Sequence, residues 1–260
     1  EDASNKVSYG RRRSYFNGKE LDSVMNYPYG NAIIGYILSC NSAFLFSTVK
    51  RIYAHYPKCV SDCNMNILGT HDTARALTRL SGIGEEGRSN EQLSVSRMPQ
   101  DKRQLAVKRL KLAYFLLCVL PGVPCIYYGD EAGMEGYHDP FNRMPFPWNN
   151  IDKGLLSFYR RMGKIRRAEK IFAGGWLRLC EKMPQGVFAL RRFDGKNEIF
   201  AAVNLSGSQV SFELSGFDMM RNKPVSGKRT ISDMGFCLIK RKRSEADPEC
   251  RMQQLPDVRI

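Results

Sequence analysis

Residues 1–170 alternate between short buried strands and helices, and this order restricts the chain to few folds. Apolar runs with the length of buried strands lie at 21–27, where Pro28 closes the run, at 65–68 and at 123–128. Apolar residues at helical spacing predict helices over 31–38, 42–56, 74–80, 101–120 and 155–165, with loops at 82–99 and 133–150. This alternation predicts parallel βα units, because two parallel strands need a crossover connection between them.

The pattern changes after residue 170. Short strand-like runs follow at 176–179, 187–193, 199–204, 209–214 and 236–239. Turn signals such as Asp194-Gly195 and Ser206-Gly207 separate them. We therefore expect three parts: an α/β domain over 1–170, an antiparallel β-sandwich over 171–240, and a charged, disordered tail over 241–260.

Polar side chains stand where the predicted parallel strands end. Asn26 follows the first strand, His71-Asp72 the second and Asp130-Glu131 the third. The loop after the third strand adds Asp139, Arg143 and Trp148. In parallel α/β folds the chemistry collects beyond the carboxyl ends of the strands, so these groups are the candidate site.

The charge and the apolar runs exclude two classes of protein. The chain carries 40 Lys+Arg against 26 Asp+Glu, a formal charge of +14, but its basic residues fall in separate short clusters. Without a DNA- or RNA-binding motif these clusters predict solvated helix faces and a basic tail rather than nucleic-acid binding. No window holds the ~20 consecutive apolar residues of a membrane span, so we expect no membrane partner.

The cysteines and the N-terminus indicate the compartment. The 8 cysteines include no CxxC pair, and the closest two are Cys59 and Cys63. We expect reduced thiols, a cytoplasmic protein and no metal site. The polar start, Glu1-Asp2-Ala3-Ser4-Asn5, predicts no signal peptide.

Three segments in order resemble the α-amylase superfamily, glycoside hydrolase family thirteen. The segment Asn66-Ile67-Leu68-Gly69-Thr70-His71-Asp72-Thr73 resembles its fourth signature region. The segment from Pro121 to Glu131 resembles its last barrel strand. Gly136-Tyr137-His138-Asp139-Pro140-Phe141-Asn142-Arg143, continuing to Trp148, resembles the next loop in the neopullulanase and cyclomaltodextrinase branch.

The resemblance implies a (β/α)8 TIM barrel followed by a β-sandwich, and a retaining hydrolase of α-1,4 and α-1,6 glucosidic bonds. Asp72 matches the family's third carboxylate, which binds and distorts the sugar, and His71 matches a histidine that contacts sugar hydroxyls. Asp139 and Arg143 match donor-side sugar contacts. The resemblance implies maltodextrin, cyclodextrin or pullulan as partner, no cofactor, and a homodimer for the full-length enzyme; it leaves a structural calcium ion open.

The sequence departs from the family in two places. It contains no Gly-x-Arg-x-Asp motif, which carries the nucleophile in the family, and its start resembles the stretch just after the general-acid motif. A whole barrel takes about 250 residues, and only 1–170 are available here. We therefore expect about the last three βα units, catalytically incomplete alone. The alternative is a noncatalytic carbohydrate-binding remnant.

Each candidate residue also has a structural interpretation. Asp72 could cap the following helix, and His71 could be a satisfied structural histidine. Arg143 could pair only with Asp139. Asp130-Glu131 could contact a ligand, although the adjacent Gly129 indicates a tight turn.

Overall fold

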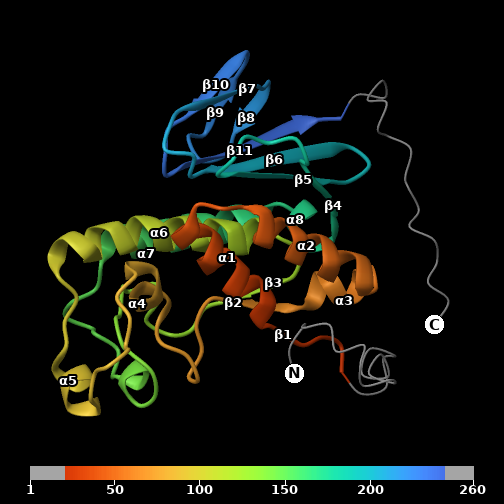
Figure 1. Ribbon diagram of the computed structural model, residues 1–260. Coiled ribbons are helices and arrows are strands. Elements are labelled where there is room, and N and C mark those ends of the chain that lie inside the picture. The colour runs from red at the N-terminus through yellow and green to blue at the C-terminus, as the bar shows by residue number, and fades with distance from the viewer. Residues whose placement is uncertain (1–20, 244–260) are drawn as a thin grey trace.

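The computed structural model describes residues 21–243, so Glu1, Asp2 and most of the expected tail lie outside the described residues. Its first part is built on a parallel sheet of three very short strands in the order β1-β2-β3. These strands are β1 (Met25–Asn26), β2 (Met65–Ile67) and β3 (Val123–Cys125). Figure 1 shows them below a layer of helices, with the β-rich part of the chain above that layer.

Buried asparagines connect these three strands through their side chains. Asn26 Nδ2 donates to Asn66 Oδ1 at 2.9 Å, and Asn66 Nδ2 donates to the carbonyl oxygen of Pro121 at 2.8 Å. Asn26 Oδ1 also accepts a hydrogen bond from Tyr29 N and so caps the next helix. Because Asn26 and Asn66 are fully buried, these bonds are needed to offset the loss of water.

The five predicted helices are present in the predicted order, with differences at their ends, and three further short α-helices occur among the described residues. The structure has α1 (Tyr27–Ser39), α2 (Ala43–His55), α3 (Lys58–Cys63), α4 (Ala76–Ser81), α5 (Asn90–Val95), α6 (Gln100–Val119), α7 (Lys153–Ala168) and α8 (Ile171–Gly174). Pro28 lies in the first turn of helix α1 instead of closing a strand, because proline fits this turn, where the N–H groups need no partner within the helix. Helix α5 lies in the predicted loop 82–99, where Ser89 and Gln92 form a capping box.

Two contacts hold the helices close to the sheet. Gly30 of α1 lies directly on β2, where a Cβ atom would approach the carbonyl oxygen of Ile67 to 2.2 Å. Helix α6 is buried over its second half, from Leu112 to Val119, and packs against α1, α4 and α7. The predicted strand 123–128 is shorter than expected: β3 ends at Cys125, and a turn begins at Tyr128.

The second part of the chain forms two antiparallel sheets. The larger has the order β4-β5-β6-β11-β8-β9, and β7 and β10 form the smaller. The strands are β4 (Trp176–Leu179), β5 (Val187–Phe193), β6 (Asn197–Asn204), β7 (Val210–Glu213), β8 (Gly216–Asp218), β9 (Lys223–Val225), β10 (Lys228–Ile231) and β11 (Gly235–Lys242). Strand β11 continues to Lys242, so residues 241 and 242, predicted as the start of a disordered tail, belong to the sheet. Lys240 to Lys242 pair with β6, and this long-range pairing gives a charged segment its structure.

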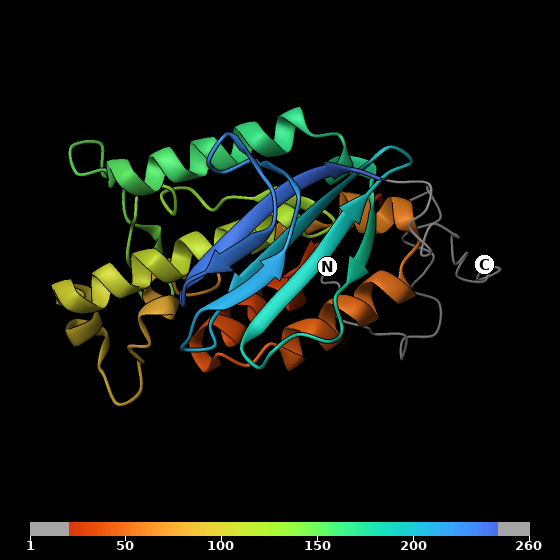
Figure 2. The same cartoon turned by 90° about the horizontal axis from the view of Figure 1, so that it is seen from above.

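The larger sheet lies against the helices, as Figures 1 and 2 show. One continuous apolar core includes residues of α1, α6 and α7 together with Phe188, Leu190 and Val203 of the sheet. Tyr36 Oη of α1 donates to the carbonyl oxygen of Gly186 at 2.8 Å. The two parts predicted as separate domains therefore share a core in the structure.

Arg192 of β5 joins the two parts through four backbone carbonyls. Its fully buried guanidinium donates to the carbonyl oxygens of Val119, Ile171, Phe172 and Gly175 at 3.1, 3.2, 3.4 and 3.0 Å. Burial lowers its pKa to about 10, above neutral pH. The charged side chain thus satisfies carbonyls near the ends of α6 and α8 that would otherwise be buried without partners.

Replacing Arg192 by methionine keeps an unbranched side chain that can stay buried, but it removes every donor. We expect Arg192→Met to lower the free energy of unfolding by about 3 kcal/mol, because several buried carbonyls lose their partners. Urea unfolding measures the change. The exposed Arg167→Met serves as the matched control, and equal losses in both variants would show that Arg192 does not join the two parts.

Candidate functional site

A tight turn follows β2 and carries the first two predicted site residues. Thr70 N donates to Thr73 Oγ1 at 3.1 Å, and Asp72 N donates to Thr70 Oγ1 at 3.2 Å. The His71 and Asp72 side chains point into solvent, 58% and 59% exposed, with His71 Nε2 and Asp72 Oδ1 3.1 Å apart. The backbone of this turn is fixed by hydrogen bonds, while the side chains of His71 and Asp72 stay accessible.

The turn excludes one structural interpretation of Asp72. Helix α4 begins at Ala76 with Arg75 in the capping position, and no side chain caps its first turn. Asp72 therefore does not act as the helix cap, and the ring of His71 is the side-chain partner that the structure gives it.

Asn142 clamps this turn from the loop after β3. It lies in the short 3-10 helix η3 (Phe141–Arg143) and is fully buried. Its Nδ2 lies 2.8 Å from both the His71 and the Thr73 carbonyl oxygens and 3.4 Å from the Thr70 carbonyl oxygen. One amide thus connects two segments that are 72 residues apart.

Asp139 and Arg143, the other two predicted site residues, flank Asn142. Arg143 Nε donates to Asp139 Oδ1 at 2.7 Å, and both side chains are about half exposed, 46% and 53%. The ion pair between Arg143 and Asp139, which was the structural interpretation of Arg143, is therefore present. Because Asn142 contacts the turn after β2, this ion pair lies beside His71 and Asp72 at one edge of the sheet.

Further hydrogen bonds fix the loop that carries the ion pair. Gly136 N donates to Thr78 Oγ1 at 2.9 Å, and the Gly136 carbonyl accepts from Arg75 N at 2.9 Å. His138 N donates to Glu85 Oε1 at 2.9 Å, and the His138 ring contacts the same carboxylate. The loop is thus held to α4 on one side and to residue 85 on the other.

A buried pair lies beneath the site. Arg75 is fully buried, and its Nη1 lies 3.5 Å from Asp130 Oδ1. The same nitrogen also donates to the carbonyl oxygen of Tyr128. The same guanidinium stacks 4.6 Å from the ring centroids of Tyr127 and Tyr128. Burial raises the pKa of Asp130 from 3.8 to about 7, against the opposing effect of Arg75.

Asp130 and Glu131 consequently serve the local structure of the turn, as the adjacent Gly129 indicated. Asp130 is 3% exposed. Glu131 Oε2 accepts a hydrogen bond from Gly129 N at 2.9 Å within the turn. Both carboxylates are thus engaged in local structure.

Sequence reasoning did not find Asn142 or Arg75 as supports of the site. Each acts on residues that are distant in sequence. Asn142 lies inside a segment that the resemblance marked, which is a weak signal, whereas Arg75 lies in the predicted helix 74–80, where an arginine indicates only an exposed face.

The surroundings of the turn are open. A small hollow beside it is lined by nine residues, among them Tyr27, Gly69, Thr70 and Arg79, and not by His71 or Asp72. Residues 21–243 contain no group of three or more His, Cys, Asp and Glu side chains placed to hold a metal ion. Within the same residues, none of the helices has the length and apolar character required to cross a membrane.

This arrangement defines a parallel α/β unit with a polar cluster at the carboxyl edge of its strands. The family profile described as "Alpha amylase, catalytic domain" matches residues 5–171. The chain therefore belongs to the α-amylase family.

Relatives of known activity match part of their own length. A cyclomaltodextrinase from Bacillus sp is 30% identical over 220 residues, which are 82% of this chain and 35% of that protein. An amylopullulanase from Thermoanaerobacter thermohydrosulfuricus is 38% identical over 170 residues, 61% of this chain and 11% of that protein. The chain thus spans about a third or less of these two relatives.

Solved structures match over both parts of the chain. A maltogenic amylase from S. marinus aligns with a TM-score of 0.69 and 27% identity, covering 88% of this chain and 30% of that chain. A cyclic α-maltosyl-(1→6)-maltose hydrolase from Arthrobacter globiformis aligns with a TM-score of 0.70 and 23% identity, covering 88% and 46%. The second comparison shows a shared fold.

Removing the amide of Asn142 tests the clamp. We expect Asn142→Ala to lower the free energy of unfolding by about 1–3 kcal/mol, because three carbonyl oxygens lose their donor. Urea unfolding measures the loss. The exposed Asn90→Ala is the matched control, and a loss no larger than in that control would contradict the clamp.

Asp130 predicts a pH dependence of stability. Because the pKa of Asp130 is raised in the folded protein, the folded state holds this proton more tightly than the unfolded state does. The resulting contribution to stability is complete below pH 3.8 and is lost as the pH rises through about 7. Asp130→Asn removes this titration. The stability of the wild type relative to that variant should therefore fall with rising pH, by on the order of 1.4 kcal/mol per unit.

Urea unfolding of both proteins at about pH 5 and about pH 8 measures this difference. The exposed Asp22→Asn should follow the wild type at both values. Parallel profiles for wild type and Asp130→Asn would show that Asp130 does not titrate in this range.

Proposed function

We propose that residues 1–170 are the last three βα units of the (β/α)8 catalytic barrel of an α-glucan hydrolase of the neopullulanase and cyclomaltodextrinase type. One observation carries the proposal: the Asn142 amide holds the Asp139–Arg143 pair beside His71 and Asp72. The matches to a cyclomaltodextrinase and to an amylopullulanase support the substrate class. Maltodextrins, cyclodextrins and pullulan are the proposed substrates of the complete enzyme.

The chemistry of the four side chains suits a sugar ring. The Asp72 carboxylate accepts hydrogen bonds from two adjacent hydroxyls, and its charge strengthens these bonds. His71 donates to or accepts from a hydroxyl through its exposed ring. Asp139 and Arg143 present an acceptor and a set of donors on the other side of the ring. In the complete enzyme Asp72 would bind and distort the sugar.

Hydrolysis needs groups beyond these four. A retaining glycosidase uses a nucleophilic carboxylate and a carboxylic acid about 5 Å apart. At this site Asp72 contacts His71 and Asp139 is paired with Arg143. The nucleophile motif of the family does not occur in the sequence. We propose that this chain binds α-glucans but does not cleave them alone.

An activity assay tests the catalytic part of this proposal. Purified 1–260 should release no reducing sugar from maltotriose or cyclodextrin above the uncatalysed background, because a carboxylate pair for the two chemical steps is missing. A relative with a complete catalytic domain serves as the positive control. Measurable turnover that is lost in Asp72→Asn would refute catalytic incompleteness.

A titration tests the binding part. Maltotriose should bind saturably to 1–260, and Asp72→Asn should weaken binding about tenfold, because charged hydrogen bonds contribute about 1.5–3 kcal/mol. Isothermal titration calorimetry measures the affinity. Glu86→Gln, on the exposed loop before α5, is the control. Binding that is absent, or equal in both variants, would exclude Asp72 as a sugar-binding group.

A further inference from the structure

A cationic groove lies along helix α7, outside the site described above. It has a volume of about 890 Å³ and is open to solvent. Its walls are α7 and the segment 148–151 at the end of the loop after β3. Its lining includes Trp148 and Asn149 on one side and the basic residues Lys153, Arg160, Arg161 and Lys164 of α7 on the other.

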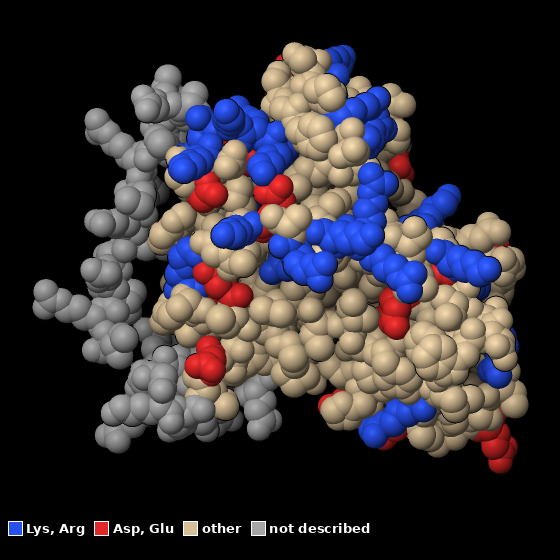
Figure 3. All heavy atoms as spheres, turned by 180° about the vertical axis from the view of Figure 1, so that it is seen from behind, with Lys and Arg blue, Asp and Glu red and all other residues tan. Residues whose placement is uncertain are grey.

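The basic side chains form one stripe on the helix. Lys153, Arg160 and Lys164 recur at spacings of seven and four residues, which places them on one face of α7. In the part of the chain that the structure describes, none of the three has an ion pair with a carboxylate. Figure 3, seen from the α7 side, shows Lys and Arg gathered in a band across the middle of this face.

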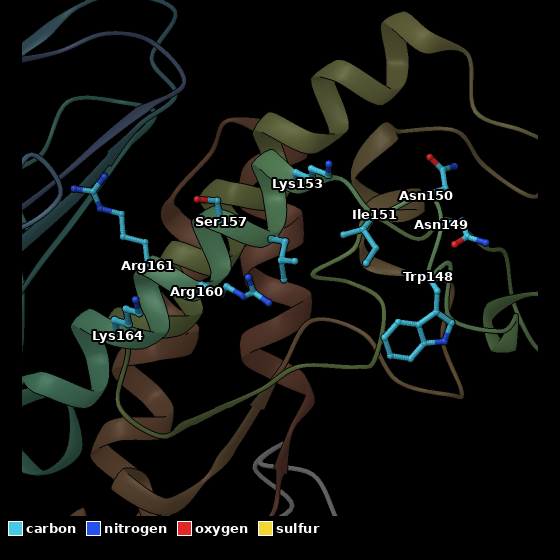
Figure 4. A pocket seen from close by; sticks show the side chains of 10 residues that line it. Trp148, Asn149, Asn150, Ile151, Lys153, Ser157, Arg160, Arg161 and Lys164 are labelled. Atoms are coloured by element: carbon cyan, nitrogen blue, oxygen red, sulfur yellow. The ribbon is translucent and has the colours of Figure 1, made fainter.

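This stripe is unfavourable for the helix itself. Arg160 and Lys164 are like charges at positions i and i+4, and such pairs destabilise a helix by about 0.2–0.5 kcal/mol. Arg161 differs, because it donates to the carbonyl oxygen of Met220 in the β-rich part. Figure 4 shows Arg161 at the far side of the groove, with its guanidinium extending away from Trp148, and Arg160 extending toward Trp148. An anion in the groove would remove the repulsion.

Trp148 is the second unexplained feature, on the opposite wall. It is 77% exposed, and its ring lies 4.6 Å from that of Phe146, centroid to centroid. An exposed indole offers a flat apolar face on which a sugar ring can stack, and the amide of Asn149 beside it can pair with hydroxyls. The volume falls within the roughly 300–1,000 Å³ of ligand sites.

We propose that this groove binds an α-glucan chain that carries a phosphate monoester. The sugar stacks on Trp148, and the phosphate lies between Arg160 and Lys164 of α7. Arginine forms paired hydrogen bonds with phosphate oxygens, and lysine adds a point charge. The glucan part of the ligand rests on the proposed function, since the loop that ends at Trp148 also carries Asp139 and Arg143. The phosphate part rests on the basic stripe alone.

The two tryptophans of the chain allow a direct measurement. In Trp176→Phe, Trp148 is the sole indole, so its fluorescence reports on the groove. The probes are maltotriose, maltotriose 6-phosphate, inorganic phosphate, ATP and a single-stranded RNA oligomer. We expect maltotriose 6-phosphate to change the emission saturably, at least tenfold more tightly than maltotriose or phosphate alone.

Two double variants locate the phosphate contact. Arg160→Ala with Lys164→Ala should weaken binding of the phosphorylated sugar at least tenfold. Lys182→Ala with Lys228→Ala removes the same charge from exposed positions elsewhere and should leave the affinity within twofold. Equal effects of the two pairs would reduce the stripe to general electrostatic attraction and overturn the proposal.

The remaining outcomes separate this inference from the proposed function. In Asp72→Asn the change in Trp148 fluorescence on adding maltotriose 6-phosphate should persist. In the double variant Arg160→Ala with Lys164→Ala, the calorimetric binding of neutral maltotriose at the candidate site should persist. Tighter binding of ATP or RNA than of the phosphorylated sugar would assign the groove to another ligand class and overturn the inference. So would a Trp148 emission that no probe changes.

Discussion

The structure depends on the burial of backbone carbonyls at the junction between its two parts. A guanidinium from β5 reaches the carbonyl oxygens near the ends of α6 and α8, and it is fully buried there. Arg166 of α7 donates to the Phe172 carbonyl as well, at 3.2 Å. Buried carbonyls need donors, and arginine has enough of them to serve several at once. The larger β-sheet is thereby fixed against the helices that hold the parallel strands in place.

The candidate site uses the same principle on a smaller scale. The turn after β2 exposes the side chains of two candidate site residues, but its backbone carbonyls face inward toward the Asn142 amide. A polar contact between backbone and amide positions the turn without using the His71 or Asp72 side chains. Beneath it, the buried Arg75–Asp130 pair supports the adjacent turn at Tyr128. The polar groups that support the turn are thus buried, and the side chains of the candidate site are exposed.

The parallel sheet also explains why the site is open. Strands β1 and β3 each pair on one side only within the described residues. Side chains along β3 and the segment after it remain accessible, with Val123 51% and Ile126 42% exposed. A sheet of this kind is normally covered on both faces and continued at its edges. The aligned parts make up 35% and 11% of the matched cyclomaltodextrinase and amylopullulanase, so both relatives have residues beyond the part that this chain matches.

The sequence by itself predicted the parallel strands, the longer helices and five strands of the second part, and it indicated four candidate site residues. It did not predict helices α3 and α8 or strands β8, β9 and β10. Apolar periodicity predicts α1, α2, α6 and α7, because a buried helix face repeats every three to four residues. The position of His71-Asp72 directly after a strand follows from the same pattern, and three ordered segments indicated the family that the profile match establishes. Helix α5 was missed although its capping box is a local signal.

Only the tertiary structure decided which polar residues support the site and which charges remain unpaired. Asn142 acts on residues 72 positions away, and Arg192 on a carbonyl 73 positions away. A single hydrogen bond between distant segments leaves no periodic trace in the sequence, and any loop asparagine or strand arginine would look the same. The basic stripe of α7 became a groove only when the chain placed Trp148 opposite Arg160. The spacing of residues along the chain fixes which face of a helix or strand each residue occupies, but only the tertiary fold decides which other residues that face contacts.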